Sequence, residues 1–272
     1  MTLGARGPGE TSWMRLLLGL AVVFALFHFV AAALGSDRGQ AGLLVGALVV
    51  AATLAAERVL FGVPATRAAR DVGLGRPAMR GLLAAAGACM LLLLVFPALA
   101  ALGCASVVVD SRGAALLPGL FAQGGVAEEA LFRGYLFRRV RAGRTFWHAV
   151  ALATVPFVAV HLFLFATMPW QIALAAVALS AIVGAPLAHL FELGGGTVWA
   201  PALLHFTIQG AIKLVSLDPS DARLPVIWMA ASAVLPFLVF LVPRRERLAT
   251  AATRAHDAPP PSIASDSLRS RR

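Results

Sequence analysis

A small group of ionisable residues interrupts an otherwise apolar stretch of this sequence. Glu128 and Glu129 lie within "GGVAEEALFRGYLF" (residues 124–137), and Arg133 follows the second glutamate by four residues. A charged side chain at the centre of a bilayer costs about 2.5–3.5 kcal/mol on insertion scales. Glu129 and Arg133 share one helix face and can neutralise each other. Glu128 lies about 100° further round the helix, so it needs a partner from another helix or from water.

Two further apolar stretches each carry a polar pair at the same four-residue spacing. Phe157 and His161 occur in "PFVAVHLF", and His205 and Gln209 occur in "PALLHFTIQG". A single histidine, or a single Glu–Arg pair, is often structural. Three such segments together favour a site, because polar groups inside a bilayer turn inward and pair. We expect one polar cavity, lined by Glu128, Glu129, Arg133, His161, His205 and Gln209.

These residue types suit the hydrolysis of a peptide bond. A carboxylate beside an imidazole can activate a water molecule as a general base. A second histidine and an amide can stabilise the oxyanion that forms when water adds to a carbonyl. A divalent metal such as zinc stays an alternative, because Glu plus two His is a known zinc set. No HExxH motif is present, so a metal-bound water and a glutamate-activated water both stay open.

The other polar residues of the apolar stretches have no companion motif. We interpret His28, His148, His189, Lys213 and His256 as non-catalytic. His189 is the strongest exception, and it could form a helix-end pair with Glu192. Cys89 and Cys104 fit no disulfide or metal pattern and read as packing residues.

Composition places the chain among polytopic membrane proteins. Of its 272 residues, 60% are hydrophobic and only 13% are charged, and the mean hydropathy is +0.84. Soluble domains have about 25% charged residues. The first apolar run is longer than a signal-peptide core, which favours an uncleaved span. We therefore predict an all-α, polytopic membrane helix bundle of about eight transmembrane helices. The expected spans are 13–35, 40–61, 80–102, 115–137, 146–167, 170–191, 197–216 and 224–243.

The basic residues predict the orientation of the chain. The net charge is +10, and the arginines gather between apolar runs, as in cytoplasmic loops of membrane proteins. This pattern argues against nucleic-acid binding and predicts that both termini are cytoplasmic, in a bacterial inner membrane. Residues 1–243 are expected to form one membrane domain with a motif-bearing core at about 70–216. Residues 244–272 are rich in Pro, Ser and Arg and are expected to be a disordered basic tail.

The three motifs resemble those of the CAAX-processing and bacteriocin-processing (CPBP) intramembrane protease family, which includes the type II CAAX prenyl protease. The family's EExxxR matches 128–133, and its FxxxH matches 157–161. Its third motif, a histidine followed four residues later by Asn or Asp, matches 205–209 except that Gln209 has one more methylene. Residues 71–83 also resemble the segment before a core span in bacterial members.

The resemblance implies a membrane-embedded endopeptidase acting on a membrane-associated protein or peptide. Glu128 would activate water with the aid of His161, and His205 and Gln209 would stabilise the oxyanion. Glu129 and Arg133 would support the site. The main alternative is a non-catalytic scaffold or bacteriocin-immunity protein that keeps the protease fold. A transporter is less favoured, because no internal repeat is evident. The substrate and the oligomeric state are not encoded in any motif.

Overall fold

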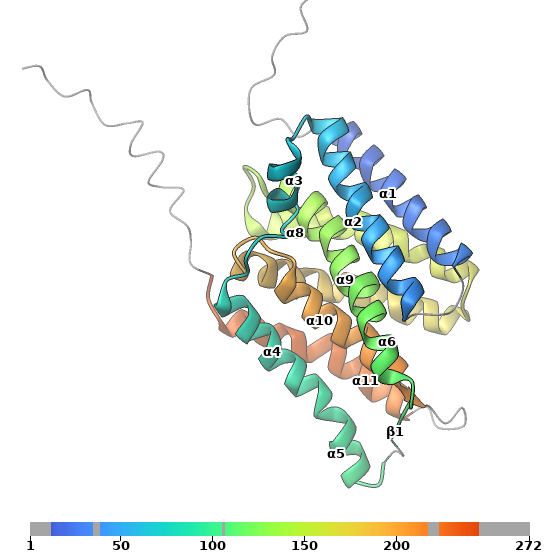
Figure 1. The fold of residues 1–272 in the computed structure, drawn as a ribbon. Coiled ribbons are helices and arrows are strands. Elements are labelled where there is room, and N and C mark those ends of the chain that lie inside the picture. The colour runs from blue at the N-terminus through green and yellow to red at the C-terminus, as the bar shows by residue number, and fades with distance from the viewer. Residues whose placement is uncertain (1–11, 35–38, 105–106, 217–222, 245–272) are drawn as a thin grey trace, which may run out of the picture.

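The computed structural model describes residues 12–34, 39–104, 107–216 and 223–244, which form a helix bundle (Figure 1). The only strands in this part of the chain are β1 (Val108–Val109) and β2 (Val215–Ser216), which pair antiparallel. The expected basic tail lies outside the described residues, apart from Arg244. The α-helices are α1 (Trp13–Ala33), α2 (Gln40–Phe61), α3 (Ala65–Asp71), α4 (Met79–Leu93), α5 (Val95–Ala101), α6 (Gly113–Leu120), α7 (Arg138–Arg141), α8 (Phe146–His161), α9 (Trp170–Leu193), α10 (Trp199–Gly210) and α11 (Arg223–Val234).

Other helix types connect several of these elements. Two π-helical segments, η1 (Phe121–Ala127) and η2 (Ala130–Phe137), lie in series between α6 and α7. Three 3-10 segments, η3 (Leu162–Ala166), η4 (Ala211–Leu214) and η5 (Leu235–Leu241), extend α8, α10 and α11. The fold is therefore the predicted all-α helix bundle.

Six helices of the described residues are long and apolar enough to cross a membrane. They are Trp13–Ala33, Gln40–Phe61, Met79–Ala101, Phe146–Ala166, Trp170–Leu193 and Arg223–Leu241. The spans expected at 115–137 and 197–216 are helical, but the first changes helix type twice and α10 has only 12 residues. The count of eight is thus not confirmed. Every residue of η2 is buried, and so are eight residues of α10, so neighbouring helices rather than lipid surround these two segments.

Small residues let η1 and the end of α6 fit between α2 and α10. A Cβ atom on Gly42 of α2 would lie 2.6 Å from the carbonyl oxygen of Gly119 in α6. On the other side, a Cβ atom on Gly125 would lie 2.9 Å from the carbonyl oxygen of Ala202 in α10. Close backbone approach of this kind is how small residues hold membrane helices together. It brings the glutamates beside α10.

Arginines and two glutamates, Glu57 and Glu192, gather at one end of the bundle, which we call the arginine-rich end. The fully buried Glu57 at the end of α2 accepts a 2.9 Å hydrogen bond from Arg138 and a second bond from Arg139. Glu192 at the end of α9 accepts hydrogen bonds from Arg141 at 2.6 Å and from Arg244 at 3.1 Å. These pairs link α2, α7, α9 and the end of the described chain.

The expected helix-end pair between His189 and Glu192 is replaced by another arrangement. His189 Nε2 lies 3.0 Å from the carbonyl oxygen of Val242, to which it donates. Its ring packs against Phe240, with centroids 4.5 Å apart. Arg141 and Arg244 bind Glu192 in place of His189. Arginine stays charged at neutral pH, and the geometry of its N–H donors suits a carboxylate. His189 therefore packs against the last helical segment, η5, and the chain that follows it.

Candidate active site

The two glutamates lie at the junction between the π-helical segments η1 and η2. Only Glu128 and Glu129 have α-helical geometry between Phe121 and Phe137. Single π-turns within helices are frequent at functional sites. The Glu129 side chain is fully buried, whereas the Glu128 side chain is 16% exposed. The side chains of Glu128 and Glu129 thus point into different surroundings, as expected for neighbours about 100° apart around a helix.

Glu129 is bound by residues from two helices. Its Oε1 atom accepts a 2.9 Å hydrogen bond from Arg133 and a 2.6 Å hydrogen bond from Nδ1 of His205. Because a carboxylate can only accept here, Nδ1 of His205 carries the hydrogen. The opposite ring nitrogen, Nε2, lies 3.7 Å from Oε2 of Glu128. Glu129 therefore fixes the orientation of His205 relative to the other glutamate.

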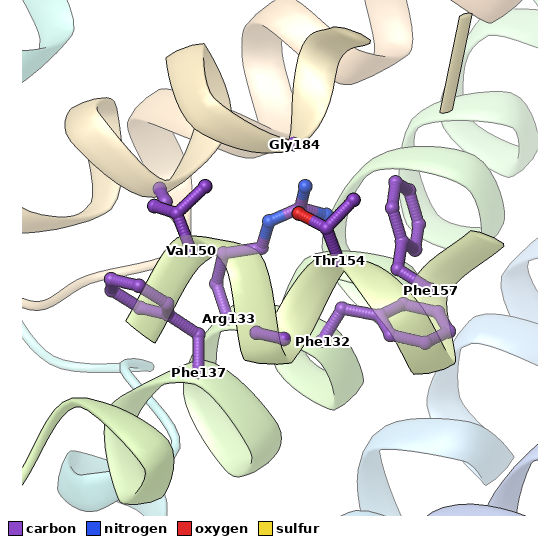
Figure 2. A pocket seen from close by; sticks show the side chains of 9 residues that line it. Phe132, Arg133, Phe137, Val150, Thr154, Phe157 and Gly184 are labelled. Carbon is purple, nitrogen blue, oxygen red and sulfur yellow. The ribbon is translucent and has the colours of Figure 1, made fainter. Parts of the chain in front are cut away.

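The ring of Phe157 contacts both His161 and His205 and packs over the guanidinium of Arg133. The Arg133 guanidinium lies 4.5 Å from the centroid of the Phe157 ring. The same ring makes edge contacts with His161 and His205, at centroid distances of 4.8 and 6.1 Å. Figure 2 shows Arg133 extending from η2 towards Gly184 of α9, beside a cavity of about 10 Å³. That volume is at the lower limit for one water molecule, so this region is closely packed.

Glu128 meets the third motif through the amide of Gln209. Gln209 Nε2 lies 3.4 Å from Oε1 of Glu128, and it also donates to the carbonyl oxygen of Gly124. A Cβ atom at position 124 would lie 2.8 Å from the Gln209 amide carbon, so Gln209 would have to move away. The first glycine of "GGVAEE" thus leaves room for the contact of Gln209 with η1. The longer Gln side chain reaches both acceptors.

His161 has a defined tautomer on the other side of Glu128. Its Nδ1 atom lies 2.7 Å from the carbonyl oxygen of Phe157, which can only accept. In the neutral ring, Nε2 is therefore the unprotonated nitrogen. This nitrogen can accept a proton or a hydrogen bond.

Two cavities meet at Glu128. The larger, which we call the main cavity, has a volume of about 360 Å³, and both Glu128 and His161 line it. The smaller, the polar side pocket, has a volume of about 90 Å³, and Glu128, Gln209 and Lys213 line it. Gln123 lines both. One water molecule needs about 10–15 Å³ of such space, so the polar side pocket has room for water beside Glu128.

The six expected site residues are close together, but they do not line one cavity. Glu129, Arg133 and His205 are buried and line neither of the two cavities that meet at Glu128. Oε1 of Glu129 binds both Arg133 and His205, whereas its buried Oε2 has no hydrogen-bond partner. The expectation of one shared cavity was wrong in this respect. The sequence also gave no role to Gln123, His28 or Lys213, which line the cavities. His28 lies four residues after Phe24, so both occupy one helix face, and this spacing was the sequence signal that could have indicated their shared position.

The described residues contain no group of three His, Cys, Asp or Glu side chains placed to hold a metal ion. The set considered for zinc was Glu128, His161 and His205. In both histidines Nδ1 is already engaged, with Phe157 and with Glu129. These contacts leave the Nε2 atoms for chemistry beside Glu128. The arrangement fits a carboxylate that activates water.

Comparison with known proteins identifies the family of the segment that carries the site. The model of the family described as type II CAAX prenyl endopeptidase Rce1-like matches residues 110–211. This range contains all three motifs, from Glu128 to Gln209. Searches of curated proteins and of solved structures returned no significant match. The family and the six apolar helices together indicate an integral membrane protein. Residues 110–211, which carry the candidate site, match the model of this Rce1-like family, in agreement with the resemblance that the motifs predicted.

Proposed function

We propose that this protein is an intramembrane endopeptidase in which Glu128 activates a water molecule to hydrolyse a peptide bond. The observation that carries the proposal is the division of labour between adjacent glutamates. Glu129 is held by Arg133 and His205, whereas Glu128 faces the main cavity together with His161. A base must reach solvent or substrate, and of the two glutamates only Glu128 does.

The proposed reaction starts with a water molecule at Glu128. The carboxylate takes a proton as the water oxygen attacks the carbonyl carbon of the substrate, with His161 Nε2 accepting a hydrogen bond from the same water. The resulting oxyanion is stabilised by Gln209 and by protonated His205, whose second hydrogen lies on Nε2. Collapse of the tetrahedral intermediate breaks the C–N bond. The proton held by Glu128 then passes to the leaving amine.

Glu129 and Arg133 act in this proposal as positioning residues. Glu129 orients His205 through its hydrogen bond with Nδ1, so that Nε2 of the ring lies on the side of Glu128. Arg133 neutralises the buried Glu129 at 2.9 Å. A divalent metal such as zinc stays a further proposal for this site, with Glu128 and the histidine Nε2 atoms as its available ligands.

We further propose a bacterial inner membrane location with both termini in the cytoplasm. The support is the arginine-rich end, where Arg138, Arg139, Arg141 and Arg244 gather. Cytoplasmic loops of membrane proteins carry such an excess of arginine. The substrate would be a membrane-associated protein or peptide. The oligomeric state does not enter the mechanism, because all six residues come from one chain.

The second candidate is a non-catalytic membrane scaffold or immunity-type protein that keeps the protease fold. One observation favours it: Gln209 departs from the Asn or Asp of the family motif, and its amide already donates to Gly124. A donor used by the backbone is less available to an oxyanion. The two candidates differ in whether peptide bonds are broken.

The test compares protein termini by mass spectrometry in cells with wild type, Glu128→Gln or His161→Ala. His148→Ala is the matched control, because His148 is exposed at the start of α8 and remote from the cavities. Termini that disappear in both site variants but persist in the control, at equal protein levels, would support the protease and name its substrate. Termini unchanged in all four strains would favour the scaffold.

A further inference from the structure

The polar side pocket and the main cavity reach Glu128 between different helices. The side pocket is enclosed by the end of α6, η1, the end of α10 and η4, and its lining residues are Leu120, Gln123, Gly124, Glu128, Gln209, Gly210 and Lys213. The main cavity is enclosed mainly by α1, α8 and η3. The two linings share Gln123 and Glu128. The proposed base is therefore accessible from two separate spaces.

The lining of the polar side pocket suits water. The amides of Gln123 and Gln209, the Glu128 carboxylate and the Lys213 ammonium group can all form hydrogen bonds, and Leu120 is its one large apolar residue. A buried water molecule makes about three hydrogen bonds, whereas cavities that stay dry are apolar. The pocket volume of about 90 Å³ also exceeds the need of a single water molecule.

Exposure increases along the polar side pocket from Glu128 outward. Leu120 is only 5% exposed and Glu128 is half-buried, whereas Lys213 is exposed. The pocket therefore leads to the surface beside Lys213 in η4. The main cavity has a different exposed rim, at Thr167 and Met168, which follow η3. Each space thus has its own connection to the outside of the bundle.

Hydrolysis requires water at Glu128 while the peptide is bound. In the proposed reaction the peptide lies beside Glu128 and His161, which places it in the main cavity. A bound peptide displaces water from the space that it occupies. The polar side pocket stays accessible to Glu128 at that stage, because Gln209 Nε2 lies only 3.4 Å from Oε1 of the carboxylate and both groups line the pocket.

We propose that the polar side pocket binds water and delivers the hydrolytic water to Glu128, separately from the main cavity that admits the peptide. This inference rests on the proposed function, because it assigns a route to the water that the reaction consumes. The water oxygen bonds to the carbonyl carbon as the C–N bond breaks. One of its hydrogens passes through Glu128 to the leaving amine, and the other stays on the new carboxyl group. The next water then enters past Gln123.

The first test detects water in the pocket without depending on cleavage. The full chain in lipid nanodiscs is exposed to a brief X-ray pulse, which generates hydroxyl radicals from nearby water, and oxidised residues are located by mass spectrometry. Leu120 reports the pocket, and the fully buried Leu204 of α10, which lines neither cavity, is the control. We expect oxidation of Leu120 above the level at Leu204. Equal oxidation of the two leucines would overturn the proposal.

Three variants then test the route. Lys213→Trp places a large ring at the mouth of the side pocket, Leu117→Trp adds the same ring at an exposed position of α6 outside it, and Ala31→Phe narrows the main cavity. Oxidation of Leu120 should fall to the level at Leu204 in Lys213→Trp and persist in the other two. Loss of the label in Ala31→Phe would show that water arrives through the main cavity, which would refute the route.

Cellular termini connect the pocket with the reaction. The termini that depend on Glu128 should decrease in Lys213→Trp and stay at the wild-type level in Leu117→Trp. Unchanged termini in Lys213→Trp, despite the lost label at Leu120, would overturn the assignment of the hydrolytic water to this route. Low oxidation of Leu204 in every variant verifies that the fold is kept, because unfolding would expose this residue.

The outcomes also separate this inference from the proposed function. Oxidation of Leu120 together with termini that are unchanged in Glu128→Gln would leave the water site standing and remove the protease. Termini lost in Glu128→Gln, with Leu120 oxidised no more than Leu204, would keep the protease and remove the water route.

Discussion

The buried ion pair between Glu129 and Arg133 can be tested against an exposed pair in the same chain. Arg67 and Asp71 on α3 are also four residues apart, with 3.4 Å between Nε and Oδ2. The Arg67 side chain is 73% exposed, whereas the Arg133 side chain is 4% exposed. Arg133→Met and Arg67→Met therefore remove the same group from two environments at the same helical spacing.

The expected magnitudes differ because only one substitution leaves an uncompensated buried charge. Removing one partner of a buried pair typically costs about 3–5 kcal/mol, since the other charge stays without water. Exposed pairs contribute about 0.2–1 kcal/mol. Arg133→Met should thus lower the free energy of unfolding by at least about 2 kcal/mol more than Arg67→Met. The Glu129 carboxylate, which is fully buried and also bound to His205, is the reason.

The measurement is reversible unfolding by SDS in mixed micelles, followed by tryptophan fluorescence. A double variant, Glu129→Gln with Arg133→Met, should recover part of the loss, because it leaves no buried net charge at the pair. Peptide cleavage by the folded fraction is measured in parallel and should be low in the double variant, since His205 there loses its charged partner Glu129. A cost for Arg133→Met within about 1 kcal/mol of that for Arg67→Met would refute the reasoning.

Three other predictions concern the amide, the aromatic ring and the orientation. Gln209→Asn shortens the side chain by one methylene and moves the amide about 1.5 Å away from Glu128. We therefore expect kcat to fall roughly 10²-fold with KM unchanged. A rise in kcat would show that the shorter side chain suits the site better. Phe157→Leu keeps an apolar group but removes the ring over Arg133, a contact worth about 0.5–2 kcal/mol. We expect this variant to lower kcat by up to about thirtyfold at an unchanged protein level. Full activity would contradict a role of the ring in positioning Arg133 and the two histidines. Thr167→Cys, at the cavity rim, should react with an impermeant maleimide added outside intact spheroplasts. Ala142→Cys, at the arginine-rich end, should react with the same reagent only after lysis. The reverse labelling pattern would show that the proposed topology is inverted.

The sequence alone predicted the class of the protein and the residues of the candidate site. Membrane insertion penalises every charge by several kcal/mol, so Glu128, Glu129 and Arg133 were conspicuous in an apolar chain. The four-residue spacings of 157–161 and 205–209 marked one helix face each. These signals are local, and the family match over 110–211 agrees with them. The expected count of eight spans is not confirmed, because the segment 115–137 changes helix type twice and α10 has only 12 residues.

Only the tertiary structure decided which glutamate faces the cavity and what forms its walls. Glu128 and Glu129 are neighbours of one residue type, and their roles separate because α10 brings His205 to one and Gln209 to the other. The contribution of α1 likewise depends on contacts between residues more than a hundred positions apart, such as His28 and Phe163. Apolar side chains facing lipid and apolar side chains lining a cavity have the same composition. Their difference lies in which helix packs beside them, and that is a property of the folded bundle alone.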